Sequence, residues 1–136
     1  MIVLDASLLV ASKLKGDVHH VAARDVFGAI DRGRWGEALL PDYVFVETMN
    51  VLAARKGLAL AVEAGDQFLS AQGVELVPCS DLLMDAYEIF QRQSKPRLSL
   101  ADAAIVAVAR RHGAPFVATF DADFRTVEGI QVVPDQ

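Results

Sequence analysis

Five short stretches of the chain are apolar at nearly every position and predict buried β-strands. They do not alternate with polar residues, and most are rich in β-branched or large apolar side chains and end at Pro, Asp or Thr. Continuous apolar strands are typical of a parallel sheet that is covered on both faces. The predicted strands are residues 2–4, 38–40, 74–77, 116–118 and 130–133.

Helical stretches separate these strands, and their ends carry the residues that commonly begin and end helices. Asp or Ser at the start, cations in the last turn and Gly just beyond the end are typical of helix termini. Strands alternating with helices indicate right-handed crossovers, so we expect an α/β fold with a central parallel sheet and helices on both faces. The predicted helices are 17–30, 42–57, 58–73, 80–93 and 99–113, the first beginning at Asp17.

The length and composition indicate one folded domain that spans residues 1–136. Hydrophobic residues make up 53% of the chain and charged residues 23%, which excludes a disordered class. The single cysteine, Cys79, permits no internal disulfide and fits a reducing cytoplasm. We expect neither a signal peptide nor a membrane span, because no basic segment precedes the first apolar run and no apolar run is long enough.

Acidic residues follow two of the predicted strands, where parallel α/β sheets place their active sites. Asp5 comes directly after the first strand, and Asp121 and Asp123 follow the fourth. Each has a structural alternative, because Asp also caps helices and closes turns. For Asp5 alone, the cap and the functional interpretation are equally well supported.

Two further acids lie in apolar helices. Asp102 is the only polar residue in the run 100–109, although its spacing from Ser99 also fits a capping box. Glu47 shares a helical face with Val44 and Val51 and could reach water at the rim of the core. An acid in apolar surroundings needs a partner, which favours a functional interpretation for Asp102.

Together these acids predict a metal site. Carboxylates crowded in one place raise one another's pKa, and a divalent cation relieves that conflict. Oxygen ligands suit Mg²⁺ or Mn²⁺ and not zinc. The three histidines lie outside the acidic set, and we expect them to be structural or solvated; they are His19, His20 and His112. The formal net charge of -5 argues against nucleic-acid binding through overall charge, but it leaves room for a local basic patch.

Four segments, in this order, resemble the PIN domain and, more narrowly, the VapC-type toxins of bacterial toxin–antitoxin pairs. They are "VLDAS", "VETMNVL", "LSLADAAIVAVA" and "VATFDADF". The resemblance covers essentially the whole chain and implies a five-stranded sheet of order 3-2-1-4-5. It implies an acidic site made of Asp5, Glu47, Asp102 and Asp121, with Asp123 as a second candidate beside Asp121.

The resemblance also implies a metal-dependent ribonuclease that hydrolyses RNA phosphodiester bonds. Three of the acids would hold one or two Mg²⁺ ions, with Mn²⁺ as a substitute, while Glu47 would bind a second ion or position the attacking water. Ser7 and Thr119 match hydroxyl residues that orient carboxylates. Lys95 and Arg97 are the preferred cations for RNA, because they precede Asp102 closely in the sequence.

As partners, the resemblance implies a cognate antitoxin and a second copy of the chain in a homodimer, in the cytoplasm and away from membranes. Two other functions stay open from the sequence. One is a PIN-fold nuclease without an antitoxin that acts in RNA maturation or on structured DNA. The other is a non-catalytic PIN module that binds RNA or protein, which the complete set of acids disfavours.

Overall fold

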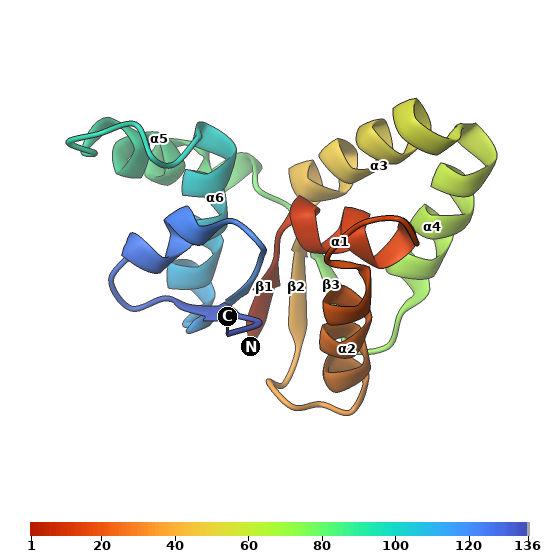
Figure 1. Ribbon diagram of the computed structural model, residues 1–136. Helices are drawn as coiled ribbons and strands as arrows, with labels where there is room; N and C mark the ends of the chain where they lie inside the picture. The colour runs from red at the N-terminus through yellow and green to blue at the C-terminus, as the bar shows by residue number, and fades with distance from the viewer. Residues whose placement is uncertain (136) are drawn as a thin grey trace.

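The computed structural model describes residues 1–135 and contains one five-stranded parallel sheet (Figure 1). The strand order is β3-β2-β1-β4-β5, and every neighbouring pair is parallel. This confirms the predicted α/β class and sheet order. The strands are β1 (Ile2–Leu4), β2 (Ala38–Pro41), β3 (Val74–Val77), β4 (Phe116–Ala118) and β5 (Gln131–Val133).

Helices cover both faces of the sheet, which confirms the predicted three layers. Figure 1 shows α5 and α6 on one side of the strands and α1, α2 and α4 on the other. The α-helices are α1 (Ala6–Lys13), α2 (His20–Asp31), α3 (Asp42–Lys56), α4 (Leu58–Ser70), α5 (Leu83–Gln91) and α6 (Leu100–His112). Two short 3-10 helices complete the fold, namely η1 (Ser80–Leu82) and η2 (Ala122–Thr126).

Two helix starts differ from the prediction. Asp17 does not begin α2, because its Oδ1 accepts a hydrogen bond from the backbone N of His19 at 2.8 Å and closes a turn. The helix therefore begins three residues later, at His20. The predicted helix at 80–93 opens as the 3-10 helix η1, and α5 begins only at Leu83.

The core lies around β1, the central strand. Ile2, Val3 and Leu4 are all completely buried, because β2 and β4 flank them within the sheet and α6 packs on β1 and β4. In α6, Ala103 and residues 105–109 are also buried, as the apolar composition of this helix predicts. This packing holds the end of β1 in place. Among the described residues, no helix combines the length and apolar character that crossing a bilayer requires.

Candidate active and metal site

Asp5 lies at the end of the central strand, and it serves as a helix cap as well as a member of the acidic site. Its backbone N donates to Ala118 O at 3.1 Å, which extends the pairing of β1 with β4. Its Oδ1 accepts a hydrogen bond from Ala6 N at 2.8 Å and so caps α1. The side chain is only 8% exposed. The two interpretations left open by the sequence are therefore compatible.

Two hydroxyl groups hold the other oxygen of Asp5. Its Oδ2 accepts hydrogen bonds from Ser7 Oγ at 2.9 Å and from Thr119 Oγ1 at 2.7 Å. Thr119 is 1% exposed, and the two hydroxyl oxygens are 3.2 Å apart. With bonds to both oxygens, the carboxylate has a fixed orientation. The predicted orienting residues are thus in contact with Asp5.

The same hydroxyls arrange the loop that follows β4. Ser7 Oγ accepts a hydrogen bond from Phe120 N at 3.1 Å, and Thr119 Oγ1 accepts one from Asp121 N at 2.9 Å. Asp121 Oδ1 in turn accepts a hydrogen bond from Asp123 N at 2.9 Å and caps η2. Asp121 is therefore joined to Asp5 through Thr119, whereas Asp123 lies one step further along the loop.

Asp102 is held at the start of α6 by the capping box that its spacing predicts. Ser99 Oγ accepts from Asp102 N, and Asp102 Oδ2 accepts from Ser99 N, both at 3.0 Å. Burial raises the pKa of Asp102, the two bonds with Ser99 oppose that shift, and the charges of Asp5 and Asp121 add to it. Asp102 is therefore close enough to both acids to be affected by their charge.

Glu47 lies on α3 with an exposed side chain, which agrees with a position at the rim of the core. Its pKa is raised, first by partial burial of the carboxyl group and then by the charges of Asp5 and Asp102. The fold thus brings carboxylates from α3, α6 and two strand ends into one electrostatic cluster. They interact even though they come from separate parts of the sequence.

The chemistry of this cluster fits a hard divalent cation that keeps part of its water shell. Within residues 1–135, no three acidic, histidine or cysteine side chains stand close enough together to ligate one ion directly. Asp102 Oδ2 and Asp121 Oδ1 each accept a hydrogen bond from a backbone N–H. Among the described residues, no hydrogen bond reaches the other oxygen of either carboxylate, Asp102 Oδ1 or Asp121 Oδ2. These two oxygens can accept from water, and Mg²⁺ commonly binds carboxylates with several waters retained.

Tyr43 is a member of the site that the sequence analysis missed. Its hydroxyl donates to Ala101 O at 2.7 Å, which links the start of α3 to the first turn of α6. Burial raises the pKa of Tyr43, as do Cys79 and the nearby acids, so the phenol stays protonated and keeps donating. An aromatic residue in the first turn of a helix usually signals core packing, so the sequence alone carries no marker for this link.

Among the described residues, no hydrogen bond joins the remaining predicted residues to the acids of the site. Lys95 and Arg97 are exposed on the loop between α5 and α6, where they line a hollow together with Arg110. Cys79 is buried, as predicted, and burial together with Asp42 raises its pKa to about 12. Its thiol is therefore protonated at neutral pH, which argues against a role as a nucleophile.

The histidines do not enter the acidic cluster as ligands. His19 stacks on Phe120 with ring centroids 4.2 Å apart and an interplanar angle of 8°, so it supports the loop that carries Asp121. His20 Nδ1 lies 2.8 Å from Ala11 O and joins α2 to α1. His112 is exposed at the end of α6. These positions agree with the structural or solvated roles expected for all three.

Comparison with protein families identifies this arrangement. The PIN domain model matches residues 2–130, nearly the whole chain. The chain belongs to the PIN domain family. No curated protein sequence matches this PIN domain at a significant level.

Solved structures of toxins share its fold. The Mycobacterium tuberculosis toxin VapC20, described as cleaving the sarcin–ricin loop, has a TM-score of 0.81 and 26% identity over 92% of this chain and 93% of its own. VapBC2 of Rickettsia felis, bound to a promoter DNA fragment, has a TM-score of 0.74 and 17% identity over 97% of both chains. A toxin–antitoxin complex from Klebsiella pneumoniae has a TM-score of 0.67 and 17% identity over 96% of both chains. Together with the family, these neighbours support a VapC-like toxin nuclease.

Proposed function

We propose that this PIN domain is a Mg²⁺-dependent ribonuclease and the toxin of a VapBC-type toxin–antitoxin pair. The observation that carries the proposal is the cluster of carboxylates around Asp5 at the carboxyl end of the sheet. Asp5 is held by two hydroxyls, and burial, together with the charges of the cluster, raises the pKa values of Asp102 and Glu47. Carboxylates held together in this way are stabilised by a divalent cation.

In this proposal Asp5, Asp102 and Asp121 hold Mg²⁺, with Mn²⁺ as a substitute. When bound, the cation supplies a Lewis acid that neutralises the scissile phosphate and the surrounding carboxylates. Asp121 is a better fourth acid than Asp123, because its charge affects Asp102 and its backbone N bonds to Thr119. Ser7 and Thr119 keep Asp5 aimed at the ion, since each donates to Asp5 Oδ2.

Glu47 has the properties of a proton acceptor for the attacking water. Its side chain is exposed, so water and substrate can reach it, and its raised pKa makes it a stronger base than an ordinary glutamate. Binding a second cation is the other role for this carboxylate. Tyr43 positions the helix that carries Asp102, through its bond to Ala101 O.

The substrate is RNA in this proposal, and it must approach an acidic pocket. A bound cation reduces that repulsion, and basic side chains elsewhere on the surface reduce it further. Lys95 and Arg97 are candidates, since they are exposed and share a hollow with Arg110.

The toxin role and its partners are supported by the structural neighbours, two of which are toxin–antitoxin complexes. We expect a cognate antitoxin and a homodimer in the cytoplasm. An apolar stripe on α5 supports protein contacts, because four large side chains on this helix are exposed at helical spacing. These side chains are Leu83, Met84, Tyr87 and Phe90.

Cleavage of an RNA panel tests the enzymatic part. The purified protein should cut RNA with Mg²⁺ or Mn²⁺ and lose activity with chelator. Asp5→Asn and Asp121→Asn should each abolish cutting, while Asp123→Asn serves as the matched control and should retain it. Cleavage that persists in chelator, or an Asp5→Asn protein as active as the parent, contradicts the proposed mechanism.

Induced expression tests the toxin part. The parent should arrest growth, Asp5→Ala should not, and co-expression of the antitoxin should restore growth. Equal toxicity of the parent and Asp5→Ala at equal protein levels would refute the toxin assignment. It would not contradict the ribonuclease activity, which the cleavage assay tests separately.

A further inference from the structure

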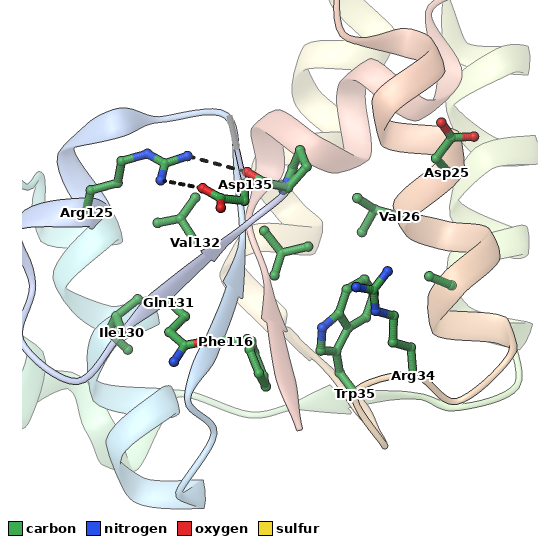
Figure 2. A pocket seen from close by; sticks show the side chains of 13 residues that line it. Asp25, Val26, Arg34, Trp35, Phe116, Arg125, Ile130, Gln131, Val132 and Asp135 are labelled. Atoms are coloured by element: carbon green, nitrogen blue, oxygen red, sulfur yellow. Dashed lines mark hydrogen bonds and ion pairs between the residues drawn. The ribbon is translucent and has the colours of Figure 1, made fainter.

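A cavity of about 540 Å³ lies between α2 and the C-terminal segment, outside the acidic cluster (Figure 2). One wall comes from α2 and from the connection that leads to β2, which carries Arg34 and Trp35. The other wall comes from η2 and β5, and it includes Arg125. Phe116 of β4 lies between the two walls, as Figure 2 shows. None of the four acids Asp5, Glu47, Asp102 and Asp121 lines this cavity.

The cavity combines an aromatic surface with two cations. The guanidinium carbon of Arg34 lies 5.1 Å from the centre of the Trp35 ring, and the Trp35 and Phe116 rings are 6.4 Å apart at an angle of 54°. Arg125 faces the cavity from the opposite wall. Aromatic rings on which bases stack, together with cations that follow the phosphates, are the means by which proteins bind single-stranded nucleic acid.

The cavity also adjoins the loop of the acidic site. Arg125 and Val132 line both this cavity and a small hollow formed by Thr119, Phe120 and Asp121. Phe116 begins β4 and lies three residues before Thr119, which directly follows that strand; this separation corresponds to roughly 10 Å at the rise of a strand. A nucleic-acid strand that crosses the acidic site can therefore reach the cavity within a few nucleotides.

We infer that this cavity binds one nucleotide of the single-stranded RNA substrate, within a few nucleotides of the point of cleavage. The base stacks on Trp35, and Arg34 and Arg125 bind the adjoining phosphates. This inference rests on the proposed ribonuclease function, because it assigns a place to the strand that flanks the scissile bond. The cavity also gives an acidic protein a place to hold a polyanion, because Arg125 lines the hollow that contains Asp121 and Arg34 lies on the opposite wall of the cavity.

Two carboxylates in the cavity compete with the phosphates. Asp135 Oδ1 lies 3.4 Å from Arg125, but its side chain is 95% exposed, and ion pairs between exposed groups are weak. A phosphate offers several oxygens to a guanidinium and can replace this partner. Asp25 lines the opposite wall. Asp135→Asn should therefore strengthen RNA binding, by freeing Arg125 and removing a negative charge.

The chain's single tryptophan, Trp35, provides the readout. The test uses the Asp5→Asn protein in chelator, so that RNA is bound without being cut, and follows tryptophan fluorescence. Short single-stranded RNA should quench this signal to saturation, whereas inorganic phosphate and duplex RNA at the same nucleotide concentration should not. Added to the Asp5→Asn background, Asp135→Asn should lower the RNA concentration needed for half-quenching.

Variants in the same background locate the contacts. Arg34→Gln and Arg125→Gln should each weaken RNA binding. Each should also make the slope of log binding constant against log salt concentration shallower by about one, as expected for one lost phosphate contact. Arg32→Gln is the matched control, since Arg32 is exposed two residues from Arg34 but does not line the cavity, and it should bind as the parent does. With labelled RNA, Trp35→Ala should lose about tenfold in affinity, and Trp35→Phe should recover most of it.

The inference is overturned if single-stranded RNA leaves the fluorescence unchanged, if phosphate alone quenches equally, or if Arg32→Gln weakens binding as much as Arg34→Gln. Its failure is distinct from failure of the proposed function. If the parent protein cuts RNA with Mg²⁺ and Arg34→Gln and Arg125→Gln cut it equally well, nucleotide binding in the cavity is refuted and the ribonuclease function is not. A parent that quenches on RNA but never cuts it refutes the ribonuclease and supports the cavity.

Discussion

Thr119→Val removes the hydroxyl that joins Asp5 to the loop after β4, and it should weaken both stability and the metal site. Thr119 Oγ1 donates to Asp5 Oδ2 at 2.7 Å and accepts from Asp121 N at 2.9 Å, in a side chain that is 1% exposed. Valine has a similar shape but can make neither bond.

The magnitude follows from these two bonds. A hydrogen bond to a charged group contributes about 1.5–3 kcal/mol, and the Asp121 N–H loses its acceptor at a cost of about 1 kcal/mol. We therefore expect the free energy of unfolding to fall by about 3 kcal/mol. With an m-value near 2 kcal/mol/M, the urea midpoint should fall by roughly 1.5 M. Loss of a residue that orients a metal ligand typically costs about 10–100-fold in metal affinity or activity.

Urea unfolding and cleavage at graded Mg²⁺ concentrations measure both effects. Thr119→Ser keeps the hydroxyl and should retain most of the metal response. Thr48→Val is the matched control, because Thr48 is equally buried but its hydroxyl donates to Val44 O within its own helix. Thr48→Val should leave the free energy of unfolding and the Mg²⁺ dependence of cleavage nearly unchanged. If Thr119→Val matched Thr48→Val in stability and in Mg²⁺ dependence, the assigned role of Thr119 would be wrong.

Three other predictions follow from the site. In the absence of divalent metal, the free energy of unfolding should fall as pH rises from about 4 through the raised pKa values of Glu47 and Asp102, because the folded protein holds these protons more tightly than the unfolded chain. Urea unfolding at a series of pH values should show this fall flattened by Mg²⁺ and less steep in Glu47→Gln, and a fall as steep in Glu47→Gln as in the parent would contradict the reasoning. Ser99→Ala removes the acceptor for Asp102 N and should cost about 1 kcal/mol in urea unfolding, whereas Ser70→Ala, an exposed helix-end control, should cost less. Tyr43→Phe loses the bond to Ala101 O and should lower single-turnover cleavage at limiting Mg²⁺ more than at saturating Mg²⁺, and equal rates at both would argue against a positioning role.

Features encoded locally were predictable from the sequence. The apolar run before Asp5 predicts a buried strand with an acid at its end, and the spacing of Ser99 and Asp102 predicts the capping box. Both depend on residues within a few positions of each other. Asp17 shows the limit of such patterns, because the same side chain can cap a helix or close a turn, and here it closes a turn.

Contacts between distant segments could not be predicted in this way. Tyr43 reaches Ala101 across 58 positions, and nothing in the sequence around either residue indicates that bond. Arg34 lies between α2 and β2 and Arg125 lies on η2, yet both line one cavity, and no local pattern around either residue indicates this. The resemblance to PIN domains predicted which acids converge, but the bonds that hold them came from the structure.

The central claim is that Asp5, Asp102 and Asp121 together hold a divalent cation. The most direct measurement is anomalous diffraction from crystals soaked in MnCl₂, with Asp5→Asn crystals as the control. The account predicts a manganese peak bounded by these three carboxylates, reached directly or through water, and its loss in Asp5→Asn. A peak that persists in Asp5→Asn, or manganese bound only elsewhere on the molecule, would contradict it.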